Sequence, residues 1–240
     1  MTGLAEFAIG SQPGSISSRM RRRRFRWFER LADPLPRPIR IIDLGGRNEF
    51  WEHHGWAGRS DVRITLVNIV AQPRRHDNIE PRVGDATDLG EFPDNGFDIA
   101  FSNSVIEHLE TRPRQAAMAR QMRRVAPACW MQTPNYWFPI EPHFLFPGWQ
   151  WMPRVVRAEL LHRLPVGGEP PCPDRRRAMQ RVEAIRLLSR RELETLFPGA
   201  TIVGERFGGV VKSWIVHDGF PPPAGGAPRT ESDAVLGFGR

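Results

Sequence analysis

The feature that most constrains the fold is an alternation of short β-rich segments with helical ones. The segment IRIIDLGG, residues 39–46, is a branched apolar run that ends in Asp43 and two glycines, which predicts a buried strand followed by a tight turn. A helix is expected to begin at Glu49 with Asn48 as its cap, and a second strand follows at residues 62–69. Strand, helix and strand in this order form a βαβ unit, which places the two strands parallel in one sheet.

The rest of the chain continues this pattern less regularly. A helix capped by the box formed by Ser189 and Glu192 precedes two closely spaced strands, which Gly208 and Gly209 separate as a hairpin. The other predicted elements are strands at residues 79–84, 97–102 and 128–133 and helices at residues 112–124 and 189–197. We therefore predict an α/β fold with a doubly wound, mostly parallel, seven-stranded Rossmann-like sheet whose last strand is antiparallel.

Composition divides the chain into four segments around one core. Residues 1–18 are rich in glycine and serine and predict a flexible leader, whereas residues 19–36 contain a basic amphipathic helix. Residues 37–219 form the main domain, and proline, tryptophan and arginine mark residues 134–180 as an insertion with one helix near residues 153–164. The tail, residues 220–240, is rich in proline and glycine.

The N-terminal helix has one apolar and one basic face. Phe25, Phe28 and Leu31 recur at helical spacing, and a run of arginines leads into them. A lid over a cofactor, a nucleic-acid surface and a membrane-surface anchor are possible functions. We favour a simpler interpretation, a helix that covers the sheet and leaves its arginines in solvent.

Charge and cysteine content exclude several classes of protein. The net charge is +7, but Lys212 is the only lysine, so the basic balance reflects arginine usage as much as a binding surface. Cys129 and Cys172 lie far apart without companion ligands, which predicts reduced thiols, no disulfide framework and no metal site. No apolar run approaches the roughly 20 residues of a membrane-spanning helix, so we expect a cytoplasmic protein.

Ligands of open α/β sheets bind beyond the carboxyl ends of the strands, so the residues at these ends are the candidates for a site. Asp43, Gly45 and Gly46 could hold a zwitterionic amino-acid group against exposed amides, although a tight turn with a capping aspartate has the same sequence. Asn68 stands where a ribose hydroxyl would be bound, or it simply ends a strand.

Two further strand ends carry polar groups. Asp85 and Ala86 could recognise adenine, or they could form an Asx turn. The segment FDIAFSNSVIEHL leads from a buried strand through Asn103 to two adjacent titratable residues, Glu107 and His108, at the predicted mouth of a pocket.

The ordered set IIDLGG, VNI, GDATDL and GFDIAFSNSVIEHL resembles motifs I to IV of class I S-adenosylmethionine-dependent methyltransferases, in particular the methyltransferase type 11 group. The resemblance covers about residues 38–133 and implies a site for S-adenosyl-L-methionine. It implies that the methionine end of the cofactor is held by Asp43, Gly45 and Gly46 and the ribose by Asn68. The adenine would be contacted by Asp85 and Ala86, and Asn103 would lie below the sulfonium. Glu107 and His108 would line the donor pocket near the acceptor.

Two positions depart from the family pattern. Arg47 and Asn48 stand where the first loop usually carries a further glycine, and Asn68 replaces the usual acidic residue. An amide lacks the acceptor strength of a carboxylate toward a diol, which predicts weaker cofactor binding. A degenerate methyltransferase fold that acts as a partner subunit is therefore an alternative. A nicotinamide-dependent oxidoreductase is not supported, because the chain lacks the G-x-G-x-x-G pattern.

The acceptor is expected to be a small molecule methylated on an oxygen or nitrogen atom. Such an atom must lose a proton, for which His108, Glu107 and His143 are the catalytic candidates. RNA is the alternative acceptor, suggested by the arginines at residues 19–26 and 174–177, but no RNA-binding motif accompanies them.

The segment around His143 is dense in aromatic residues and prolines. It could roof the acceptor site with Glu141 and His143 as polar points, or its aromatic rings could pack a satellite core. His53 and His54, on the first helix, are expected to face solvent.

Overall fold

The computed structural model describes residues 16–222 and contains a seven-stranded sheet with the order β3-β2-β1-β4-β5-β9-β8. All neighbouring pairs among β1 to β5 are parallel, and β9 runs antiparallel to both β5 and β8. The strands are β1 (Ile39–Leu44), β2 (Val62–Asn68), β3 (Ile79–Val83), β4 (Ile99–Asn103), β5 (Ala128–Pro134), β8 (Thr201–Phe207) and β9 (Val210–Asp218). The predicted fold class is confirmed.

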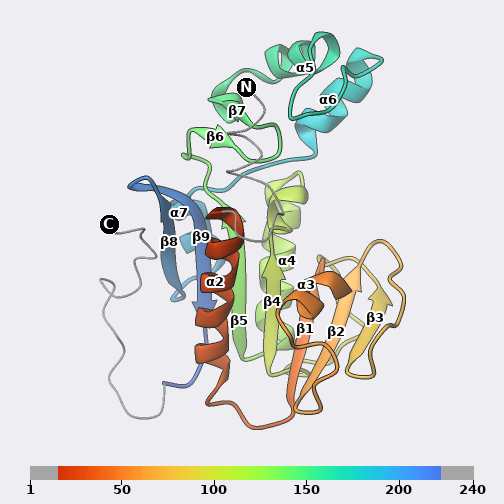
Figure 1. Cartoon of the computed structure of the whole chain (residues 1–240), viewed down its shortest axis with the longest axis vertical. Helices are drawn as coiled ribbons and strands as arrows, with labels where there is room; N and C mark the ends of the chain where they lie inside the picture. The colour runs from red at the N-terminus through yellow and green to blue at the C-terminus, as the bar shows by residue number, and fades with distance from the viewer. Residues whose placement is uncertain (1–15, 223–240) are drawn as a thin grey trace.

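Helices cover both faces of this sheet (Figure 1). On one face lie α2 (Ile16–Ala32) and α3 (Asn48–His53), and on the other lie α4 (Arg112–Val125) and α7 (Arg190–Leu196). Because side chains alternate along a strand, Ile39 and Ile41 of β1 join the cluster with α2 and α3, while Ile42 and Leu44 join the cluster with α4 and α7. The capping box of Ser189 and Glu192 at α7 is confirmed.

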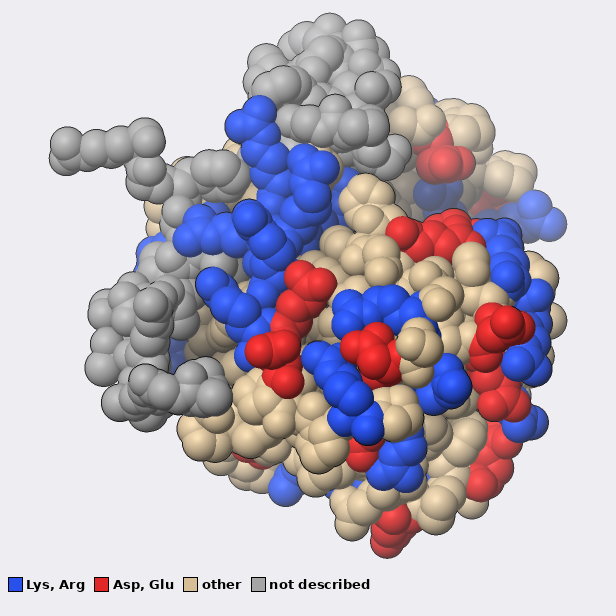
Figure 2. All heavy atoms as spheres, turned by 60° about the horizontal axis from the view of Figure 1, so that its bottom comes forward, with Lys and Arg blue, Asp and Glu red and all other residues tan. Residues whose placement is uncertain are grey.

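Helix α2 packs on the sheet through its apolar face. Phe25 and Phe28 are buried in the core, and exposed arginines occupy the opposite face. Figure 2 shows basic side chains gathered densely on one part of the surface and mixed with acidic ones elsewhere. The prediction of a covering helix is confirmed, but not all of its arginines lie in solvent, because the side chain of Arg24 is only 11% exposed. The helix begins at Ile16, within the leader predicted at residues 1–18, and the rest of that leader lies outside the described residues, as do residues 223–240 of the predicted tail.

Two local expectations at α3 were wrong. Arg47, in extended conformation, occupies the N-cap position, whereas Asn48 is the first helical residue and its buried side chain donates a hydrogen bond to the carbonyl oxygen of Pro73. His53 is exposed as expected, but His54 is half-buried and stacks on Phe25 with ring centroids 3.9 Å apart. An aromatic partner from α2, distant in sequence, therefore covers a histidine that the local pattern leaves in solvent.

The insertion between β5 and α7 builds a small subdomain beyond the end of the sheet at which β4 ends (Figure 1). It contains β6 (Ile140–Glu141), β7 (Phe146–Pro147), the 3-10 turn η2 (Trp149–Trp151), α5 (Arg154–Arg163) and α6 (Arg175–Glu183). Helix α5 was expected; α6 and the β6–β7 hairpin were not. Phe144 and Trp149 pack its satellite core, whereas Trp137 and Trp151 are largely exposed, so the packing interpretation holds for only part of the aromatic segment.

Both cysteines are free, as predicted, and the structure buries Cys129 in the main core and Cys172 in the satellite core. Within residues 16–222, every helix is too short or too polar to cross a bilayer.

Candidate functional site

A cavity of about 640 Å³ opens at the carboxyl ends of β1, β2 and β4. All of the predicted cofactor-binding residues line it, namely Asp43, Gly45, Gly46, Asn68, Asp85, Ala86 and Asn103. His108 lines it as well. The tertiary structure thus brings these strand ends together around one space, as expected for a doubly wound sheet. Their roles toward a cofactor stay predictions.

The turn after β1 can be formed only by glycine at two positions. A Cβ on Gly46 would lie 2.2 Å from Oδ2 of Asp43, and one on Gly45 would lie 2.4 Å from Cγ2 of Val105. Gly45 also has a φ of 77°, in the left-handed region that favours glycine. The backbone of this turn therefore passes directly over the Asp43 carboxyl group and faces the cavity.

Asp43 is buried beneath this turn and is bonded to α3. Its Oδ2 accepts a hydrogen bond of 2.7 Å from the indole Nε1 of Trp51. Burial raises the pKa of Asp43 to about 8, although the bond from Trp51 acts in the opposite direction. In the described structure the carboxyl group supports the turn from below.

The raised pKa of Asp43 predicts a pH dependence of stability. The folded protein binds the Asp43 proton up to a pH of about 8, whereas the unfolded chain releases it near pH 4. The contribution of Asp43 to the free energy of unfolding should therefore be greatest below pH 4 and fall by up to about 1.4 kcal/mol per pH unit as the pH rises toward 8. Denaturant unfolding of the wild type and Asp43→Asn between pH 4 and 8 tests this, because the difference between the two proteins should change with pH. Parallel stability curves would contradict it.

Asn68 braces the same turn from β2. Its Nδ2 donates hydrogen bonds of 3.1 Å to the carbonyl oxygens of both Gly45 and Gly46, and its Oδ1 accepts one of 3.0 Å from the backbone of Val70. A carboxylate could not make the first two bonds because it has no donor. The departure from an acidic residue at this position therefore has a structural cause.

We expect Asn68→Asp to weaken the site, although it restores the residue type usual in the family. The variant loses two donated bonds and places a carboxylate against two carbonyl oxygens, which should cost about 1–3 kcal/mol of stability. Calorimetric titration with S-adenosylhomocysteine should show lower affinity than in the wild type. A higher affinity in the variant would contradict this prediction. It would show that a contact between the carboxylate and the ligand outweighs the loss of the two hydrogen bonds to the turn.

Asp85 forms the Asx turn that the sequence offered as its alternative. Its Oδ1 accepts hydrogen bonds from the backbone and hydroxyl groups of Thr87, and its Oδ2 accepts one of 2.8 Å from Arg114. Burial acts to raise the pKa of Asp85, but the bonds from Thr87 and Arg114 outweigh it and lower the pKa. Arg114 also lines the cavity, and the sequence analysis did not identify it because it approaches from α4.

Arg47, where the family usually has glycine, has φ −136° and ψ 149°. Any residue adopts this extended conformation, so the substitution strains nothing. The side chain is exposed at the cavity.

A cluster of titratable groups borders the cavity behind His108. Glu107 is fully buried, and its Oε2 accepts a hydrogen bond of 2.9 Å from Thr133. The rings of His108 and His143 meet edge to face with centroids 4.9 Å apart, and Nδ1 of His143 lies 2.6 Å from Oε1 of Glu141. The structure therefore joins the three predicted catalytic residues, although Glu107 lies beneath the cavity wall.

A smaller pocket of about 330 Å³ adjoins the main cavity and shares Asn103 and Ser104 with it. Its apolar wall comes largely from the start of the insertion, including Phe138 and Ile140. Arg21, Arg24 and Lys212 bring positive charge to it, and Glu205 is its one acidic lining residue among those described. The sequence analysis identified neither Arg24 nor Lys212 as a site residue, because α2 and β9 meet β5 only in the folded chain.

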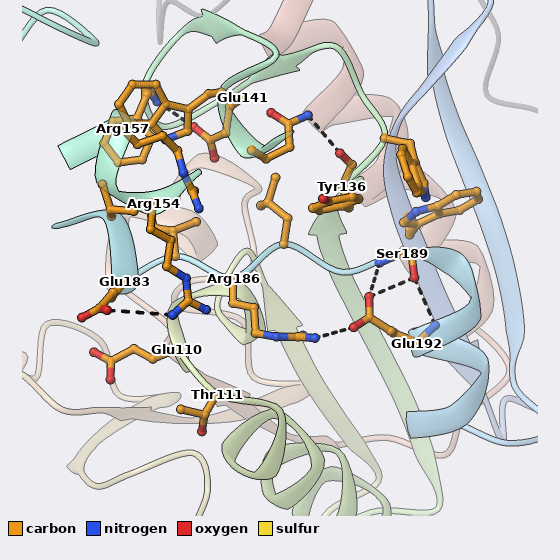
Figure 3. A pocket seen from close by; sticks show the side chains of 18 of the residues that line it. Glu110, Thr111, Tyr136, Glu141, Arg154, Arg157, Glu183, Arg186, Ser189 and Glu192 are labelled. Atoms are coloured by element: carbon orange, nitrogen blue, oxygen red, sulfur yellow. Dashed lines mark hydrogen bonds and ion pairs between the residues drawn. The ribbon is translucent and has the colours of Figure 1, made fainter. Parts of the chain in front are cut away.

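A third and larger hollow, of about 890 Å³, lies between the insertion and α7 (Figure 3). Arginines line it from both sides, but several are paired: Arg186 bonds to Glu192, and Arg154 lies 3.9 Å from Glu183. Glu141 faces this hollow, and Glu110 borders both it and the cavity at the strand ends.

The comparisons with known proteins agree with this geometry. Residues 58–128 match the family model of the methyltransferase domain. The seven strands and their order complete the fold of that family. The chain thus has the fold of class I methyltransferases, and part of it matches the model of their domain. No curated protein matches the sequence.

Solved structures with a similar fold share little sequence with this chain. The CurJ carbon methyltransferase is 11% identical with a TM-score of 0.55, covering 91% of this chain and 58% of its own. A possible exported protein from Bordetella parapertussis is 14% identical with a TM-score of 0.52, covering 88% of this chain and 70% of its own. A SAM-dependent methyltransferase from Aquifex aeolicus is 12% identical with a TM-score of 0.47, covering 81% and 87%. At these identities the likeness concerns the fold.

Proposed function

We propose that this protein transfers a methyl group from S-adenosylmethionine to an oxygen or nitrogen atom of a small-molecule acceptor. The observation that carries the proposal is the pair of adjoining cavities that share Asn103 and Ser104. Methyl transfer by displacement needs a donor and an acceptor in line and shielded from water, and two spaces that meet at one strand end suit that requirement.

The residues of the larger cavity fit the cofactor. The turn at Gly45 and Gly46 exposes backbone to the cavity where any Cβ would collide with Asp43 or Val105. A backbone cradle of this kind can approach the amino-acid end of a ligand closely. Asp85 and Ala86 border the other end of the same space, and the exposed side chain of Ile69 stands at its rim.

The cofactor, when bound, supplies an electrophilic methyl group on a sulfonium that is already a good leaving group. The protein itself would contribute by orienting the donor and the acceptor and by excluding water from the site. Asn103 and Ser104 would lie between donor and acceptor. His108, which lines the larger cavity, would receive the proton of an acceptor hydroxyl or ammonium group, with Glu107 and His143 beside it.

The smaller pocket favours an acceptor with an apolar body and an anionic group. Phe138 and Ile140 offer apolar contact, and Arg24 and Lys212 offer positive charge, part of which Glu205 offsets at 3.8 Å from Arg24. A pocket of about 330 Å³ has the size of a small-molecule site.

Binding and turnover can be tested separately. Calorimetry with S-adenosylhomocysteine should show binding at one site per chain, and its absence would favour the alternative of a non-catalytic partner subunit. With the donor site occupied, methyl transfer from labelled S-adenosylmethionine should be screened across aromatic and aliphatic acids, phenols and amines.

Bulk RNA provides the competing acceptor in the same assay. Binding that falls steeply with added salt, together with label incorporated into RNA, would overturn the small-molecule assignment.

A Lys212→Met variant should raise the KM for an anionic acceptor while leaving the affinity for S-adenosylhomocysteine unchanged.

A further inference from the structure

Three metal-ligating side chains converge beside the donor cavity. Ligand atoms of Glu107, His108 and His143 all lie within 4.8 Å of one another. Glu107 and His108 belong to the short turn after β4, whereas His143 comes from the insertion. Ligands on a tetrahedral zinc ion are about 3.4 Å apart, so small rotations, above all of the exposed His108, would bring this set to coordination distance.

One oxygen of the buried Glu107 carboxyl group has no hydrogen-bond partner among the described residues. Thr133 donates to Oε2, but among residues 16–222 no group donates to Oε1, which is itself buried. Leaving such an atom without a partner costs about 1–3 kcal/mol, and more if the group is charged. A cation bound between Glu107 and the two histidines would satisfy it.

Glu141 holds the ring of His143 in place. In many metal sites a carboxylate that does not touch the metal holds a ligating histidine in the same way. Oε1 of Glu141 holds Nδ1 of His143 at 2.6 Å, and its Oε2 accepts 2.7 Å bonds from the backbone groups of His143 and Phe144. In the tautomer that carries its hydrogen on Nδ1, His143 donates this bond to Glu141 and keeps a free lone pair on Nε2. Metal-binding histidines almost always make this bond through their other ring nitrogen.

The ligand types select the class of ion. Two imidazoles and one carboxylate suit a first-row divalent metal such as zinc, and three protein ligands leave a position open for water or substrate. Calcium and magnesium prefer oxygen ligands.

We propose that Glu107, His108 and His143 form a binding site for a divalent transition-metal ion of the zinc type, with Glu141 as the residue that positions His143. His108 lines the donor cavity, which meets the proposed acceptor pocket at Asn103 and Ser104, so the open coordination position would face the donor cavity near that junction. A bound ion would act there as a Lewis acid toward an acceptor oxygen and would make His108 a ligand instead of a proton acceptor.

The test measures metal binding directly, with neither cofactor nor acceptor present. The full chain is treated with a chelator, dialysed and titrated with Zn²⁺ by calorimetry, and Co²⁺ serves as a spectroscopic probe. We expect one ion per chain with a Kd in the micromolar range or below, and visible Co²⁺ absorption. Glu107→Gln, His108→Ala and His143→Ala should each weaken binding at least tenfold, and Glu141→Gln should weaken it about 10- to 100-fold.

Matched controls separate this site from adventitious binding. His53→Ala removes an exposed histidine of α3 and should leave the Kd unchanged. His108 is also exposed, so its variant should fold, and thermal melting establishes this for every protein compared. The proposal is overturned if the wild type binds no Zn²⁺ at high micromolar concentration, or if the three ligand variants bind as tightly as His53→Ala. S-adenosylhomocysteine titrations of the same proteins report on the proposed methyltransferase function independently.

Discussion

Gly46→Ala is expected to abolish cofactor binding. The new methyl group would lie 2.2 Å from Oδ2 of Asp43 and 2.9 Å from Leu66, and both neighbours are buried and fixed by their packing. The turn must therefore move away from the strand, which removes the backbone surface that faces the cavity. We expect the affinity for S-adenosylhomocysteine, measured by calorimetry, to fall at least 100-fold.

Gly90→Ala is the matched control for this change. Gly90 is exposed, has no left-handed φ, and an added Cβ would approach only the end of the Asp88 side chain, at 3.3 Å. The affinity of the Gly90→Ala protein for S-adenosylhomocysteine should equal that of the wild type. If Gly46→Ala folds and binds as tightly as Gly90→Ala, the turn after β1 does not contact the ligand, and the donor site is assigned to the wrong cavity.

Trp51→Ala should destabilise the protein by about 3–5 kcal/mol. The indole is fully buried between α3 and the sheet, with the rings of Phe50 and Phe101 each 5.2 Å away. Its removal also leaves the buried Asp43 carboxyl group without its donor. Denaturant unfolding monitored by circular dichroism measures the loss. One further variant at position 51 separates packing from the hydrogen bond, and a variant at position 137 is the control.

Trp51→Phe keeps an aromatic ring but removes the donor, so it should retain much of the packing and still lose about 1–3 kcal/mol from the unpaired carboxyl group. Trp137→Ala removes an indole that is 61% exposed and should change stability by less than about 0.5 kcal/mol. Equal losses in Trp51→Ala and Trp137→Ala would contradict the described core.

Local sequence was sufficient to predict most of the main domain. The strands at residues 62–69 and 128–133 and the helix at residues 112–124 were found within a residue or two of their observed bounds. Their signals are short-range: apolar runs, turn glycines and caps act between neighbours in the chain. The insertion was predicted less well, because α6 and the β6–β7 hairpin are short and depend on the satellite core for their stability.

The candidate site also has a part that the sequence predicted and a part that it did not. The strand-end residues around Asp43 and Asp85 could be identified because parallel strands deliver their carboxyl ends to one edge. The hydrogen bonds that these residues make could not, since Arg114 reaches Asp85 across 29 positions and Asn68 reaches Gly45 across 23.

By itself, the sequence determined that this chain folds as a doubly wound α/β domain with a glycine turn at the carboxyl end of its first strand. Only the tertiary structure decided that Glu107 and His143 share one cluster, with Glu141 behind them, and that α2 brings arginines to a second pocket. The physical reason is range. Periodicity and turn chemistry are properties of adjacent residues, whereas a cluster assembled from a strand end and an insertion exists only when hydrophobic packing has brought these distant segments together.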